Sequence, residues 1–227
     1  DLGSELRLIV KRSKINVSIV LKESDESAKY DLFQRLNTGG SNLSPQEVRN
    51  CILVMLNKDF YTWLRTMANN DAFQECVALS DRPLNEAYDL ELCLRFVIFA
   101  LIDTEELANL GDVGVFLTER MRSLAIDRNF DRDLWSSIFV QTFTLLAQEV
   151  GDESFKRFDS KKAKFGGGFL LSQFELVAMG VAYNLNDGVE ITGIREKISG
   201  IWTDPRFTDW SGSGITATRR LPRLLPL

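Results

Sequence analysis

Two arginines placed around a Gly-Gly pair are the residues of this sequence best suited to chemistry. Arg35 stands shortly before Gly39 and Gly40, and Arg49 follows them within a predicted helix. Glycine amides can approach a ligand closely, and a helix start carries unpaired N–H groups and a partial positive charge. Together with the amide side chain of Asn37, these groups suit an anion, and a phosphate best of all.

The helix that would position Arg49 has a clear start signal. Ser44 is the expected N-cap, Pro45 takes the first helical position, and Glu47 would close a capping box. The alternative is an ordinary interhelical turn at the two glycines, with Asn37 as its cap and the arginines in solvent.

The segment from Phe33 to Asn50 resembles the second signature of the GmrSD-type restriction endonuclease N-terminal domain family, which is ParB-like and related to sulfiredoxin. The matching residues form a Phe-x-Arg-x-Asn-x-x-Gly run and then a Leu-Ser-x-x-Glu-x-Arg-Asn helix. Residues 15–21 fit the strand before this signature, and residues 169–184 and 211–214 are similar to features of one subgroup.

The resemblance implies a nucleotide-dependent component of a prokaryotic restriction or phage-defence system, in which nucleotide hydrolysis licenses DNA cleavage by a partner or fused nuclease. Arg35 and Arg49 would contact phosphates, while Asn37 would fix the turn, a ribose or a base edge. Gly39 and Gly40 would supply backbone amides. A nucleoside triphosphate and Mg²⁺ are the implied cofactors of the whole protein.

The family's first signature, an Asp-Gly-Gln-Gln-Arg run thought to carry hydrolysis, occurs nowhere in this sequence. We therefore expect this chain to be the C-terminal part of a longer protein and to be inactive alone, with no catalytic residue assigned. The rival interpretation is a non-catalytic helical interaction module that binds a partner nuclease or nucleic acid. Its oligomeric state is left open.

Composition excludes several classes of enzyme. The 227 residues contain no histidine, which HNH nucleases, Ser-His-Asp triads and most catalytic zinc sites require. Hydrophobic residues make up 44% of the chain, so a substantial core is expected. The net charge of −5 argues against a chain that binds nucleic acid over its whole surface, although a local basic groove remains compatible.

The three cysteines lack the spacing of a metal site and lie in apolar helical runs. We expect buried free thiols in a reducing cytoplasm, and no metal ligands. No apolar run reaches the roughly 18 residues that cross a bilayer, so no membrane partner is expected.

A basic segment between Phe155 and Gly168 is the second candidate site. Cations bind phosphates and aromatic rings stack on bases, so their alternation suits a single strand or a nucleotide. The triple glycine at its end lacks the Gly-Lys-Ser/Thr ending of a P-loop. The alternative is a solvated loop between helices. The five cations are Lys156, Arg157, Lys161, Lys162 and Lys164.

Hydrophobic periodicity predicts a mainly α chain with a small α/β part. A remnant of a ParB-like domain would cover residues 1–57, with a strand at 15–21, and a multi-helix domain would cover residues 58–227. Ser172 is a predicted N-cap with Glu175 closing a second capping box. The arginines near the C-terminus predict a mobile basic tail. The predicted helices are 26–37, 45–57, 58–69, 88–103, 112–125, 129–150, 170–185 and 190–202.

Overall fold

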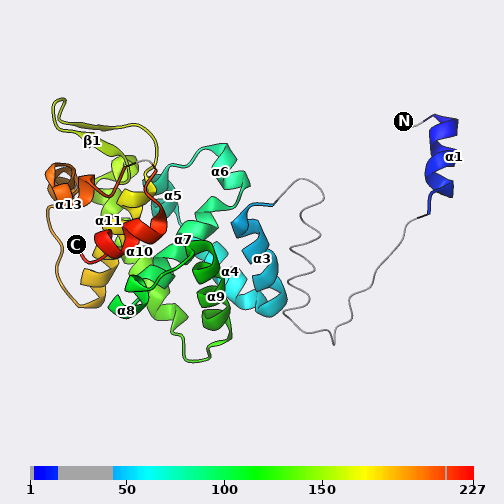
Figure 1. Ribbon diagram of the computed structural model, residues 1–227, viewed down its shortest axis with the longest axis horizontal. Helices are drawn as coiled ribbons and strands as arrows, with labels where there is room; N and C mark the ends of the chain where they lie inside the picture. The colour runs from blue at the N-terminus through cyan, green and yellow to red at the C-terminus, as the bar shows by residue number, and fades with distance from the viewer. Residues whose placement is uncertain (1–2, 15–42, 213) are drawn as a thin grey trace. The chain divides into compact units, whose positions relative to one another are not determined.

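The computed structural model describes residues 3–14, 43–212 and 214–227 (Figure 1). The chain divides into two units, Asp1–Asn42 and Leu43–Leu227. The predicted strand 15–21 and helix 26–37 lie outside the described residues. So do four of the five predicted nucleotide-binding residues, Arg35, Asn37, Gly39 and Gly40.

Helix α1 (Ser4–Arg12) is the described element of the first unit. Glu5 lies in its first turn and Lys11 and Arg12 in its last, which is the favourable arrangement of charges relative to the helix dipole.

The second unit is mainly helical, with one two-stranded antiparallel sheet in its described part. The sheet consists of β1 (Arg157–Asp159) and β2 (Lys164–Gly166). The α-helices are α3 (Pro45–Leu56), α4 (Lys58–Ala68), α5 (Asp71–Val77), α6 (Asp81–Asn85), α7 (Tyr88–Ala100), α8 (Thr104–Ala108), α9 (Val113–Ile126), α10 (Arg132–Glu149), α11 (Leu171–Asn186), α12 (Ile194–Gly200), α13 (Pro205–Thr208) and α14 (Ala217–Leu224), and the 3₁₀ helices are η2 (Gly151–Glu153) and η3 (Ile201–Thr203).

Polar side chains begin several of these helices as the sequence predicts. The Ser44 hydroxyl accepts a hydrogen bond from the backbone N–H of Glu47 at 3.2 Å, and the Glu47 carboxylate accepts one from the backbone N–H of Ser44 at 2.7 Å. Asp112 and Asp131 cap α9 and α10 through backbone amides three residues on. Each cap satisfies an amide that the helix itself leaves unpaired.

Phenylalanine rings fill the core between α5, α7, α10 and α11. The ring centroids of Phe139 and Phe143 lie 4.5 Å apart, and the Phe73 ring packs edge-on at 4.9 Å from Phe143. The aromatic side chains of α7 and α10 therefore belong to the core. On α10, Trp135 and Phe143 are buried, whereas Leu134 is 46% exposed.

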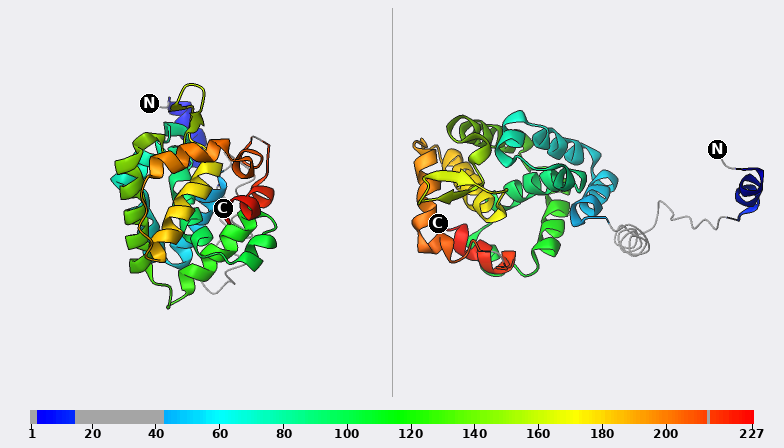
Figure 2. Two further views of the ribbon diagram at one scale, coloured as in Figure 1. Left: turned by 90° about the vertical axis from the view of Figure 1, so that its left-hand side faces the viewer. Right: turned by 90° about the horizontal axis from the view of Figure 1, so that it is seen from above.

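The C-terminal arginines do not form the predicted mobile tail. They lie on α14, which buries Leu221 and Leu224 together with Arg220. Figure 2 shows α14 beside α13, at the same end of the second unit as the β-hairpin. The tail prediction failed because the apolar residues between the arginines have the spacing of a helix that packs on one side.

The second predicted capping box is also wrong. The N-cap of α11 is Leu170, and Ser172 lies inside the helix, where its hydroxyl donates to the Ser211 carbonyl oxygen at 3.4 Å. Glu175 does not reach back to the helix start, because it is fully buried against two arginines. Ser172 and Glu175 therefore make contacts with other segments of the fold and do not cap α11.

Candidate nucleic-acid interface

The basic segment forms a β-hairpin. The alternative prediction for this segment was a solvated loop between helices. Strands β1 and β2 place Phe158 opposite Phe165, with ring centroids 4.9 Å apart. The Asp159 carboxylate accepts hydrogen bonds from the backbone N–H groups of Lys161 at 3.0 Å and Lys162 at 3.2 Å. A cross-strand aromatic pair and a turn held by an aspartate are ordinary stabilisers of a short hairpin.

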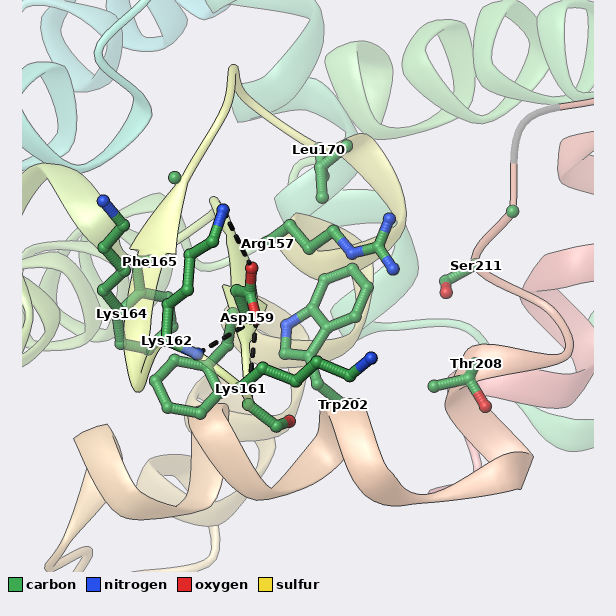
Figure 3. Close-up of a pocket in the computed structure, with 14 residues that line it drawn as sticks. Arg157, Asp159, Lys161, Lys162, Lys164, Phe165, Leu170, Trp202, Thr208 and Ser211 are labelled. Atoms are coloured by element: carbon green, nitrogen blue, oxygen red, sulfur yellow. Dashed lines mark hydrogen bonds and ion pairs between the residues drawn. The ribbon is translucent and has the colours of Figure 1, made fainter.

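The hairpin forms one wall of a cleft of ≈ 940 Å³. Residues from η3, from the end of α13 and from the segment after it form the opposite side, with Trp202, Thr208 and Ser211 among them (Figure 3). The Trp202 indole N–H donates to the buried Gln173 side chain at 3.1 Å, which fixes the ring at the cleft.

Two of the predicted cations point into this cleft. Figure 3 shows the Arg157 guanidinium and the Lys161 ammonium directed toward Thr208 and Ser211. The Arg157 guanidinium lies 5.5 Å from the centroid of the Trp202 ring, which is a cation–π contact. Neither cation has a carboxylate partner among the ion pairs of the described residues. Their charge is therefore available to an anion in the cleft.

The other three predicted cations are placed differently. Lys156 does not line the cleft, and its ammonium binds Asp152 at 2.6 Å. Lys162 lies 3.7 Å from the Asp159 carboxylate, and Lys164 points away from Thr208 and Ser211 (Figure 3). Four of the five cations thus line the cleft, and of these the side chains of Arg157 and Lys161 point toward Thr208 and Ser211.

The cleft keeps an excess of positive charge at neutral pH. Four of its lining residues are cationic and one, Asp159, is a carboxylate. Hydrogen bonds from the backbone N–H of Lys162 and then of Lys161 hold the pKa of Asp159 below its ordinary value. This carboxylate stays charged and keeps the turn closed, while the lysines and Arg157 set the sign of the cleft.

Sequence reasoning missed the side of the cleft that faces the hairpin. Trp202, Thr208 and Ser211 are distant in the chain from the basic segment. They carry no local motif, and only a folded chain shows that they meet the hairpin.

The predicted nucleotide-binding residue that is described, Arg49, is buried, with 3% of its surface exposed. Its Nε donates to the Gln46 side-chain oxygen at 2.7 Å, and its Nη2 donates to a Glu91 oxygen at 2.7 Å. The structure therefore joins Arg49 to the helical core. Arg35, Gly39 and Gly40, which were predicted to share a site with Arg49, lie outside the described residues.

Arg49 begins a chain of alternating charges across four helices. Arg95 binds the other oxygen of Glu91 at 2.8 Å, and its Nη1 binds Glu175 at 3.0 Å. Arg220 binds the second oxygen of Glu175 at 2.8 Å. Burial disfavours the charged form of Arg95, but the two carboxylates outweigh it and raise the pKa of Arg95 above its ordinary value.

Metal and thiol chemistry find no support in the described part of the chain. No group of three or more Cys, Asp or Glu side chains is placed there to hold a metal ion. All three cysteines are free, and Cys76 and Cys93 are buried as predicted, whereas Cys51 is only half-buried. Burial raises the pKa of Cys76 to about 12, so this thiol stays protonated and unreactive. None of the described helices has the length and apolar character needed to cross a membrane.

Comparisons with known proteins do not place the chain in a family. No family model matches the sequence, no curated protein matches it, and no solved structure matches the fold. The resemblance of residues 33–50 to a restriction-endonuclease signature thus stays a prediction.

Proposed function

We propose that this chain is part of a nucleotide-dependent component of a prokaryotic restriction or phage-defence system, which acts with a nuclease on DNA. In this proposal the second unit contacts nucleic acid at the hairpin cleft. The observation that carries it is the pair of cleft-facing cations, Arg157 and Lys161, beside the Trp202 ring. Residues 1–57 would then be the remnant of a ParB-like domain.

The charge distribution supports contact at one place only. The chain as a whole carries a net charge of −5, so DNA is repelled at long range. Salt screens that repulsion beyond about 8–10 Å, whereas a phosphate inside the cleft lies within contact distance of a guanidinium and an ammonium. Binding is therefore expected to be local, moderate in affinity and strongly dependent on salt.

Replacing both Arg157 and Lys161 with Ser is expected to weaken binding of a fluorescent DNA oligonucleotide about tenfold or more at low salt, because charge-assisted hydrogen bonds to phosphate are worth about 1.5–3 kcal/mol each. Fluorescence anisotropy measures the affinity. The matched control replaces Arg65 and Arg82, two exposed arginines of α4 and α6, with Ser, which removes the same charge away from the cleft.

The control should bind within about threefold of the parent, since exposed charges away from the contact act only through screened electrostatics. An equal loss in both variants would mean that binding responds only to the net charge of the protein. No loss in the Arg157 and Lys161 variant would remove the cleft from the proposal.

The nucleotide-dependent part of the proposal rests on the signature residues before α3. In a protein that also carries an Asp-Gly-Gln-Gln-Arg run, Arg35→Ala is expected to weaken nucleoside triphosphate binding by about 1.5–3 kcal/mol. Calorimetric titration in the presence of Mg²⁺ measures this change. Arg82→Ala, at an arginine exposed on α6, is the control and should leave the affinity unchanged. An unchanged affinity for Arg35→Ala with an intact fold would contradict the assignment.

The burial of Arg49 favours a second candidate function. Because this signature arginine binds Glu91 and Gln46, a role in folding accounts for its presence in the signature without a nucleotide. The chain would then be a non-catalytic helical module that binds a nuclease partner or nucleic acid. Nucleotide affinity that does not respond to Arg35→Ala would favour this candidate.

A further inference from the structure

A second arginine–tryptophan group lies next to the cleft. Trp210 directly precedes Ser211 and Gly212, which line the cleft. The Arg223 guanidinium lies 5.1 Å from the centroid of the Trp210 ring, and that of Arg219 lies 6.0 Å away. Among the ion pairs of the described residues, neither arginine has a carboxylate partner. A group of the same composition therefore begins at the residue next to Ser211 in the chain.

The helix α14 holds these two arginines outward. Arg219 and Arg223 are four residues apart, so they lie on one face of the helix, and both are exposed. The opposite face is fixed, because Arg220 binds the buried Glu175 and Leu221 and Leu224 are fully buried. The outer face of α14 is thus a rigid cationic surface.

The two tryptophans are held at fixed positions relative to each other. Trp202 packs edge-on against Phe207 of α13 with ring centroids 5.1 Å apart, and the backbone N–H of Trp210 donates to the Phe207 carbonyl at 3.1 Å. The hairpin, α13 and α14 lie at one end of the unit (Figure 2). The two tryptophans, each in contact with an arginine, therefore lie on either side of α13 in the chain.

We propose that these groups form one track for single-stranded nucleic acid, which runs from Arg157, Lys161 and Trp202 past Ser211 to Trp210, Arg219 and Arg223. This proposal rests on the proposed nucleic-acid binding at the cleft and names its ligand. A single strand can contact these cations with its phosphates and stack its bases on aromatic rings or guanidinium planes. A duplex keeps its bases paired and stacked inside, so it cannot stack them on Trp202 or Trp210.

Electrostatics favours the single strand as well. Duplex DNA has the higher density of phosphate charge, so an acidic chain repels it more strongly. Stacking on an aromatic ring contributes to single-strand affinity without dependence on base sequence. The track should accordingly tolerate many sequences and should discriminate by strandedness.

The test compares a single-stranded oligonucleotide of about 12 nucleotides, within the usual range for one single-strand site, with the duplex of the same sequence. Anisotropy should show the single strand binding at least about tenfold more tightly than the duplex at the same salt concentration. Replacing Arg219 and Arg223 with Ser should weaken single-strand binding about tenfold, by loss of two phosphate contacts. Replacing Arg65 and Arg82, two exposed arginines of α4 and α6, with Ser is the control of equal charge and should have little effect.

Each outcome separates this proposal from the one on which it rests. Equal affinity for duplex and single strand would overturn the single-strand assignment but leave nucleic-acid binding at the cleft. If the Arg219 and Arg223 variant binds the single strand as tightly as the parent, the binding site does not include α14. Failure of the parent protein to bind either oligonucleotide would overturn both proposals. Unchanged circular dichroism confirms that each variant is folded.

Discussion

Replacing Glu175 with Gln is expected to lower the free energy of unfolding by about 3–5 kcal/mol, the usual cost of removing one partner from a buried ion pair. The Glu175 side chain is completely buried and binds Arg95 at 3.0 Å and Arg220 at 2.8 Å. The amide keeps the shape of the side chain but has no charge. Two buried guanidiniums would then lose their shared counter-ion.

Urea unfolding monitored by circular dichroism measures this loss as a lower midpoint at a constant slope. Glu119→Gln, on the exposed side of α9, is the control and should change stability by less than about 0.5 kcal/mol. A Glu175→Gln change below about 1 kcal/mol would mean that water or rearranged side chains satisfy the two arginines. The ion-pair chain would then not be the link between α7, α11 and α14.

Replacing Phe143 with Ala is the second large effect, and it should destabilise the protein by about 3–5 kcal/mol. The ring is fully buried and lies at the centre of the aromatic cluster, with Phe139 at 4.5 Å, Phe73 at 4.9 Å and Phe174 at 6.3 Å between centroids. Its removal loses transfer free energy and leaves a cavity that rigid neighbouring rings cannot close.

Val140→Ala on the same helix is the matched control for Phe143→Ala. The Val140 side chain is 44% exposed, so its truncation should cost less than about 1 kcal/mol. Thermal unfolding of both variants gives the comparison. Similar losses at the two positions would contradict the assignment of the core to this face of α10.

The helices that were predictable have their signals close together in the sequence. The capping box of Ser44 and Glu47 and the caps Asp112 and Asp131 depend on residues three positions apart, and the structure contains all of them. Helices α5, α6 and α8 were not predicted, because five to seven residues are too few for a periodic pattern to stand out.

Long-range polar contacts were beyond sequence reasoning. The partners Arg95 and Glu175 lie 80 positions apart, and Arg220 and Glu175 lie 45 apart. Charged residues are usually exposed, so nothing local indicates that these would be buried together. The same limit explains Ser172, whose spacing to Glu175 is that of a capping box although Glu175 serves the core.

The candidate site was predictable on one side only. The alternation of cations and aromatics drew attention to residues 155–168, and the structure folds that segment into the hairpin wall of a cleft. The tryptophans and the C-terminal arginines that extend the site come from distant segments. Their relation to the hairpin depends on the packing of α13 and α14 against the helical core.

The salt dependence of single-strand affinity tests binding at the cleft most directly. The logarithm of the association constant should fall linearly with the logarithm of salt concentration, with a slope of about −0.7 for each phosphate contact. The Arg157→Ser, Lys161→Ser variant should lose two contacts and flatten the slope by about 1.4, whereas the Arg65→Ser, Arg82→Ser control should keep the slope of the parent. A slope unchanged by the loss of Arg157 and Lys161 would contradict phosphate binding at the cleft.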